Sequence, residues 1–73
     1  MTDQNFELTN NLKYFRKEKK MSQQDLADAV DVTRQSILMI EKNKFNPSIL
    51  LSLKIAKVLD VDINELFSIT NKD

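Results

Sequence analysis

The sequence has 73 residues, contains no glycine, histidine, cysteine or tryptophan, and carries a formal net charge of zero. This length allows one small domain, and 41% hydrophobic with 30% charged residues is typical of a folded soluble chain. Without histidine or cysteine the chain has no imidazole catalyst, thiolate ligand or disulfide, and without glycine it cannot form a phosphate-cradling loop. We therefore expect no enzymatic activity, no cofactor and no metal.

The chain shows no sign of export or of membrane insertion. Its first eleven residues are mostly polar, and the longest uninterrupted apolar segment is Ile37–Ile40. Four residues are far too few for a signal-peptide core or a membrane span. We expect a cytoplasmic protein with no membrane partner and no small-molecule ligand.

Two segments are basic although the whole chain is neutral. Residues 13–20 and residues 34–57 each carry a net charge of +4. Such basic clusters are commonly solvent-exposed faces without a binding role. Two clusters on one surface would attract phosphates, because the local electrostatic potential, and not the total charge of the chain, acts on a bound anion.

The first two expected helices begin at residues suited to capping. Thr9 is a candidate N-cap for a first helix that contains Leu12. Ser22 followed by Asp25 resembles a capping box, which would start a second helix that runs to about Val30.

The third expected helix begins after a junction of only two residues, at 31–32. Thr33 is its candidate N-cap, Ile37 and Ile40 face inward, and the helix extends to about Lys42. Two short helices joined so tightly have the geometry of a helix-turn-helix, in which the second helix can enter the DNA major groove.

The remaining segments predict two more helices. Residues 46–48 (Asn-Pro-Ser) mark a turn and a helix start before a fourth helix over 49–59. Asp62 with Glu65 predicts a capping box for a short fifth helix through about Phe67. No segment alternates with period two over a useful length, so we expect no strand and an all-α, compact five-helix bundle.

Helices usually end at a glycine in the left-handed conformation, and this chain has none. The expected stop positions hold Lys20, Asp31, Asn43 and Asp60. Aspartate and asparagine tolerate that conformation better than most residues. Lys20 does not, so we expect either local strain of about 1 kcal/mol or another kind of turn there.

The outer face of the third helix carries side chains suited to reading bases. Arg34 and Gln35 stand at its start, where arginine can pair with a guanine edge and glutamine with adenine. Leu38 lies on the same face, and Met39 lies near its edge.

Five motifs occur between residues 13 and 67, and with them the chain resembles the Cro/repressor, or Xre-type, helix-turn-helix family. The motifs are Met21–Ala27, Val32–Ile37 with Ile40-Glu41, Asn46–Ser48, Lys54–Lys57 and Asn64–Phe67. The resemblance implies a lambda-repressor-like DNA-binding domain. It also implies a sequence-specific transcriptional regulator, most simply a repressor, whose recognition helix at about 34–42 reads double-stranded DNA as a homodimer on a palindromic operator.

Carried over residue by residue, the resemblance also implies site residues. The positions that face bases are Arg34, Gln35, Leu38 and Met39. The positions near the DNA backbone are Gln23, Thr33, Ser36, Lys42, Asn43 and Lys44, with Gln23 on a phosphate and the 43–44 loop offering amides and side chains. A structural ion pair joins the first helix to the third: Arg16 and Glu41.

Two apolar features leave alternatives open. Leu38 and Met39 occupy positions where polar readers are frequent. Either they contact thymine methyl groups, or Met39 packs in the core and Leu38 is a single exposed leucine without a role. Four apolar residues off the main core stripe are candidates for a dimer interface: Leu50, Leu53, Phe67 and Ile69. The alternative is that Phe67 closes the core and only Leu50 is exposed.

We divide the chain into an N-terminal arm (1–8), the DNA-binding domain (9–68) and a C-terminal tail (69–73). Two other functions fit the same fold: a protein-interaction module that does not read DNA, and a DNA-binding antitoxin. Regulation by a protein partner is a further expectation, because a chain of this length has no room for a sensor domain.

Overall fold

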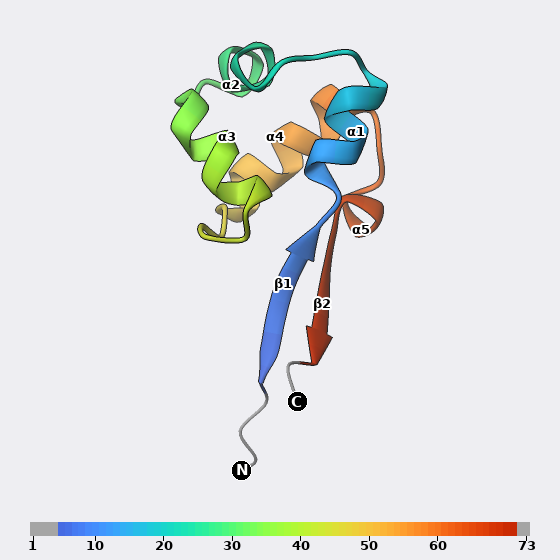
Figure 1. Ribbon diagram of the computed structural model, residues 1–73. Coiled ribbons are helices and arrows are strands. Elements are labelled where there is room, and N and C mark those ends of the chain that lie inside the picture. Colours follow the sequence, from blue (N-terminus) through green and yellow to red (C-terminus); the bar gives the residue numbers. More distant parts are fainter. Residues whose placement is uncertain (1–4, 72–73) are drawn as a thin grey trace.

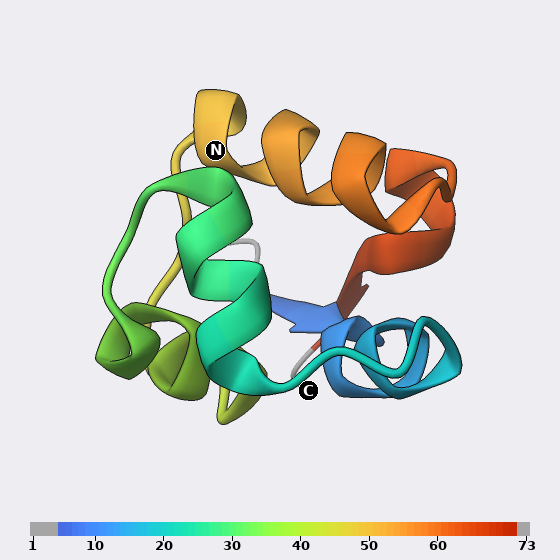
Figure 2. The ribbon, with the colours of Figure 1, turned by 90° about the horizontal axis from the view of Figure 1, so that it is seen from above.

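The computed structural model describes residues 5–71, which form five helices and two strands. The elements in chain order are β1 (Phe6–Asn10), α1 (Leu12–Glu18), α2 (Gln23–Val30), α3 (Arg34–Glu41), α4 (Ile49–Leu59), α5 (Ile63–Leu66) and β2 (Phe67–Asn71). The helices form a body, and a ribbon made of β1 and β2 projects from it (Figure 1). Seen along the ribbon, α4 runs along one side of the body while α1 and α3 lie on the opposite side (Figure 2), and α2 packs against both α3 and α4.

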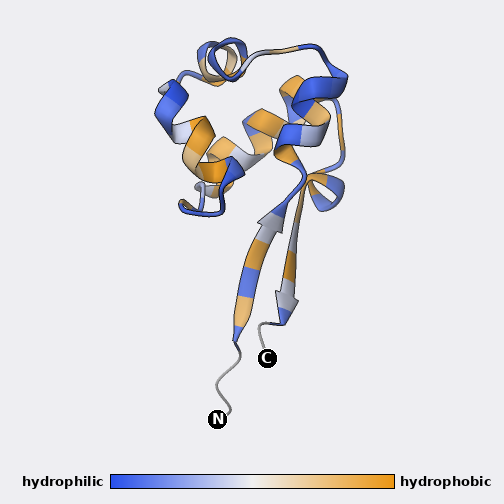
Figure 3. Cartoon of the chain, in the orientation of Figure 1, coloured by the Kyte–Doolittle hydropathy of each residue, from blue (hydrophilic) through white to orange (hydrophobic). Residues whose placement is uncertain are grey.

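Each helix contributes to one hydrophobic core. Apolar residues recur at helical spacing along the helices (orange in Figure 3), and their buried side chains form one cluster. The buried apolar residues are Leu12, Leu26, Ala27, Val30, Ile37, Ile40, Ile55, Ala56, Leu59 and Leu66.

Four of the predicted N-caps are confirmed. Ser22 and Asp25 form the full capping box, in which each side chain accepts from the other residue's backbone N–H at 2.9 Å. The hydrogen bond that the Ser22 backbone N–H donates to the Asp25 carboxyl, together with a hydrogen bond from the Ser22 side chain, lowers the pKa of this carboxyl below its ordinary value. The side chains of Thr33 and Ser48 each accept from the backbone three residues on. Asp62 is also a cap, although it accepts from the N–H two residues on and forms no box with Glu65.

The predicted cap at Thr9 is wrong. Thr9 lies in β1, and the N-cap position of α1 is Asn11. The side-chain oxygen of Asn10 accepts from the Leu12 N–H at 3.0 Å, so this asparagine satisfies a free donor of the first turn.

The four corners without glycine all adopt the left-handed conformation. Lys20, Asp31, Asn43 and Asp60 have φ between 58° and 61°. At each corner the N–H of this residue bonds to the carbonyl three residues back, and the next N–H bonds to the carbonyl five residues back. This is the Schellman pattern that normally uses glycine. The prediction of the four stop positions is therefore confirmed, and at Lys20 the first alternative, local strain, applies.

The prediction of a purely all-α fold is wrong, because β1 and β2 form a two-stranded antiparallel sheet. Its register pairs Phe6 with Asn71, Leu8 with Ile69 and Asn10 with Phe67. Directly opposed residues share a face of the ribbon, so one face is mostly apolar and the other carries Glu7, Thr9, Ser68 and Thr70. The sheet spans both boundaries that we expected at 8/9 and 68/69.

Replacing Lys20 with glycine should stabilise the protein by about 1 kcal/mol, because glycine adopts positive φ without the steric cost of a side chain. Urea unfolding followed by circular dichroism would measure this. Lys19 is the matched control, since its φ is −86°, and Lys19→Gly should destabilise through the greater freedom of the unfolded chain. Equal effects of the two substitutions would contradict the strain at Lys20.

Candidate nucleic-acid interface

The start of α3 points into solvent. Ile37 and Ile40 are 0% and 1% exposed and fix the inner face of the helix in the core. Arg34 and Gln35 are exposed on the other side. The tight turn from α2 and the Thr33 cap thus present the two predicted base-reading polar residues at the end of the helix that a helix-turn-helix inserts into the groove.

The other predicted residues of α3 lie around this exposed start. Thr33 is exposed, and its hydroxyl lies 3.1 Å from the hydroxyl of the half-buried Ser36. Leu38 and Met39 are both half-buried and lie outside the hydrophobic core cluster. Core packing therefore does not explain Met39, which instead lines a hollow at the surface.

A buried ion pair links α1 to the end of α3. The Arg16 Nε donates to Glu41 Oε2 at 2.7 Å, and the two side chains are only 8% and 5% exposed. The Arg16 Nη1 also donates to the Met21 carbonyl at 2.7 Å. The structure therefore contains the pair that the resemblance implied, with the arginine satisfied on two sides.

The ion pair continues outward to the surface through Gln23. The Gln23 Nε2 donates to Glu41 Oε1 at 3.1 Å, and the Gln23 Oε1 accepts from Arg34 Nη1 at 3.2 Å. The predicted phosphate residue thus bridges the buried carboxylate and the first residue of the recognition helix. This bridge holds the Arg34 guanidinium near the start of α2.

The loop after α3 uses its backbone amides internally. The N–H of Asn43 donates to the Ile40 carbonyl at 3.0 Å and that of Lys44 donates to the Met39 carbonyl at 2.8 Å. The expectation that these amides meet phosphates is therefore not supported, because both already cap α3. Their side chains, with that of Lys42, are exposed.

Asn10, which the sequence reasoning missed, fixes this loop. Its Nδ2 donates to the Ile40 carbonyl at 2.9 Å and to Asn43 Oδ1 at 3.0 Å. One asparagine therefore ties the base of the ribbon to the end of the recognition helix. The sequence gives no local signal for this contact, because the partners are 30 and 33 residues away.

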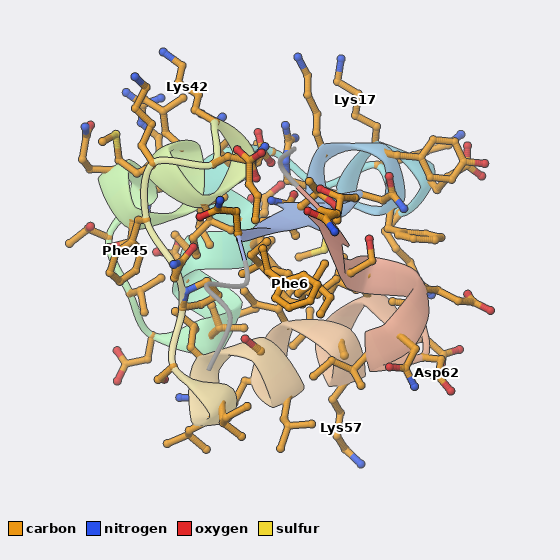
Figure 4. The ribbon with its side chains drawn as sticks, turned by 90° about the horizontal axis from the view of Figure 1, so that it is seen from below. Phe6, Lys17, Lys42, Phe45, Lys57 and Asp62 are labelled. Atoms are coloured by element: carbon orange, nitrogen blue, oxygen red, sulfur yellow. The ribbon has the colours of Figure 1, made fainter. Side chains whose placement is uncertain are left out.

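The basic side chains do not share one face. In Figure 4, Lys17 and Lys42 project from the side of the body formed by α1 and α3, whereas Lys57 projects from the opposite side, beyond α4. The positive charge near the recognition helix therefore comes from the loop after α3 and from α1.

Three of the four predicted dimer residues are exposed. Leu50, Leu53 and Ile69 are 68%, 50% and 63% exposed, whereas Phe67 is half-buried and packs against the core. The alternative is therefore right for Phe67 but wrong in leaving only Leu50 exposed. Two large exposed residues that we had not singled out, Ile49 and Phe6, adjoin these positions on α4 and on the ribbon.

The part of the chain that the structure describes holds no group of three or more potential metal-ligating side chains. Among residues 5–71, no helix has the length and apolarity needed to cross a membrane.

Substituting Glu41 with alanine should destabilise the fold by about 3–5 kcal/mol, because the Arg16 charge would remain buried without its partner. The double variant Arg16→Met/Glu41→Leu is the control, since it removes both charges at similar volume and should recover most of the lost stability. Urea unfolding of the three proteins tests this. A loss below 1 kcal/mol in the single variant would show that the pair does not constrain the fold.

The chain is similar in sequence to known helix-turn-helix proteins. Residues 12–66 match the helix-turn-helix family. A similar relative is an uncharacterized helix-turn-helix-type transcriptional regulator of Methanocaldococcus jannaschii, 45% identical over 60 residues that cover 82% of this chain and 91% of the relative.

Solved structures show the same likeness. The restriction-modification controller protein C.AhdI from Aeromonas hydrophila is 31% identical, with a TM-score of 0.70 over 74% of this chain and 82% of that one. SinR, a master regulator of biofilm formation solved in complex with DNA, is 39% identical, with a TM-score of 0.68 over 73% and 86% of the two chains. SinR has also been solved in complex with the protein SinI.

Proposed function

Because the chain belongs to the Xre-type helix-turn-helix family of transcriptional regulators, we propose that it represses transcription by binding a palindromic operator as a homodimer. The observation that carries this proposal is the exposed Arg34-Gln35 start of α3, held from behind by the buried face of the same helix. Arginine and glutamine are the side chains best suited to bidentate contacts with guanine and adenine in the major groove.

The backbone contacts follow from the same placement. The exposed side chains of Lys42, Asn43 and Lys44 flank the recognition helix at one end, and Thr33 and Gln23 flank it at the other. Contacts on both sides would set the register of α3 on the duplex, because phosphate contacts position a protein while base contacts specify the sequence. Gln23 would act on a phosphate while its amide also orients Arg34.

Selection of bound duplexes from a random pool tests the proposal. We expect a palindromic motif with half-sites about one helical turn apart, since a dimer would place its two recognition helices about 34 Å from each other. Titration of the selected duplex at two salt concentrations should then give a log–log slope of about −0.9 for each phosphate neutralised. Weak, salt-insensitive binding without a motif would contradict the proposal and favour a protein-interaction module.

Replacing Gln35 with alanine should weaken binding to the selected duplex by about 1–3 kcal/mol and relax specificity at one base pair of each half-site. Fluorescence anisotropy with the selected duplex and its single-base variants would measure both effects. Gln24 on α2 is the matched control, because its exposed amide donates to Asp28 rather than facing bases. An equal loss for every sequence in Gln35→Ala would place Gln35 on the backbone instead.

The dimer in this proposal uses the exposed apolar side chains of α4 and the ribbon. Leu50 and Leu53 lie on α4, and Ile69 lies on the apolar face of the ribbon beside Leu8. A two-stranded ribbon is marginally stable in water by itself, so a second copy that covers this face would stabilise it. Phe67 contributes through the core of its own chain.

Introducing a charge at Ile69 should weaken the dimer at least about tenfold, because an unpaired charge buried in an apolar interface costs more than about 1.4 kcal/mol. Analytical ultracentrifugation of Ile69→Glu against the unchanged protein measures this. Thr70→Glu is the matched control, since Thr70 lies on the opposite face of the same strand. Equal dissociation constants for the two variants would remove the ribbon from the interface.

A DNA-binding antitoxin is the second candidate. Its support is the exposed apolar start of α4, where Ile49 is 73% and Leu50 is 68% exposed, together with the protein-partner complex of the similar SinR. Such a regulator would still select a motif. Because Leu50 belongs to the proposed dimer, the test uses Ile49→Glu, which should keep the dimer and the DNA affinity while it loses the protein partner.

A further inference from the structure

A hollow at the surface lies beside the outward side of α3. Gln35, Ser36 and Met39 line it from the helix, and Lys44 and Phe45 line it from the loop that follows. Its volume is ≈ 240 Å³. The proposed base contacts account for Gln35 and Met39 but leave Phe45 without a role.

The loop backbone builds this hollow. Asn43 has φ of 59°, so the chain reverses directly after α3 instead of continuing away from it. The Lys44 N–H donates to the Met39 carbonyl at 2.8 Å, and the Asn43 side chain is held by Asn10 at 3.0 Å. The residues that follow therefore return beside Met39 in a fixed position.

Phe45 is an aromatic side chain that does not belong to the core. It is 45% exposed and lies outside the cluster of buried and packed hydrophobic residues. Figure 4 shows it at the edge of the body, on the loop that follows α3 and on the far side from Asp62. Together with Met39 it gives the hollow two apolar walls.

The charges around the hollow define what it can bind. Lys44 forms part of the wall, and Lys42, two residues earlier in the chain, is exposed. This lining suits an occupant that combines a small apolar group with a nearby anion. In the major groove, thymine is the base that presents such a group, its 5-methyl, and the DNA backbone supplies phosphates close by.

We propose that this hollow is a thymine-reading subsite, in which Met39 and Phe45 enclose the 5-methyl group and Lys44 binds a phosphate beside it. The inference rests on the proposed DNA binding and assigns it a specific apolar contact. In this subsite Phe45, which lies outside the recognition helix, contributes directly to the preference for thymine.

The test uses the full chain and the duplex it selects from a random pool. Each thymine of one half-site is replaced in turn by deoxyuridine, which removes only the methyl group. For the unchanged protein we expect one position to lose about fourfold in affinity, the factor that corresponds to about 0.8 kcal/mol for one buried methyl. Phe45→Ala and Met39→Ala should each abolish this difference between thymine and uracil.

Two further variants make the result specific. Phe45→Leu keeps an apolar wall and should retain most of the thymine preference. Tyr14→Ala is the matched control, because Tyr14 is an aromatic residue of α1 that is 60% exposed, and it should retain the full fourfold difference. Circular dichroism establishes that each variant is folded.

The failures of the two proposals differ. If the protein selects a motif but tolerates uracil at every thymine, or if Phe45→Ala keeps the full difference, the subsite is wrong while the regulator remains supported. If no motif is selected, sequence-specific binding itself is wrong, and the subsite falls with it.

Discussion

The orientation of α3, and with it the exposed position of Arg34 and Gln35, depends on the buried contact between Arg16 and Glu41. With side-chain exposures of 8% and 5%, neither charge can lose its partner without a large penalty. Because Glu41 is the last residue of α3, the pair fixes how that helix is rotated against α1. This rotation buries the two isoleucines of α3 and leaves Arg34 outside, and the Gln23 bridge extends the same constraint to the arginine itself.

The helical part of the fold was predictable because its signals are local. The capping box at Ser22 and the cap at Thr33 involve residues three positions apart, and both occur as predicted. The helix ends were also predictable. Asp31, Asn43 and Asp60 have positive φ, and after glycine, aspartate and asparagine tolerate this conformation best. Lys20 shows that the tertiary fold imposes this conformation even on a residue that does not favour it.

The ribbon and the loop after α3 were not predictable in the same way. In β1, apolar and polar residues alternate over only a few positions. Leu8 pairs with Ile69, which is 61 residues away, so no short segment of the sequence indicates this pairing. The place of Phe45 depends on the turn at Asn43 and on the side chain of Asn10, which comes from the other end of the chain. Both features depend on contacts between residues far apart in the sequence. They form the apolar face of the ribbon and the hollow beside Phe45, two surfaces that do not belong to the helix-turn-helix motif itself.

In the proposed complex, the exposed start of α3 contacts DNA bases. Amide chemical shifts of the ¹⁵N-labelled protein, recorded by NMR while the selected duplex is added, test it most directly. We expect the largest changes at residues 33–39 and 42–45, with small changes over α4 and the ribbon. Changes concentrated on α4 or the ribbon, with residues 34–35 unaffected, would contradict it.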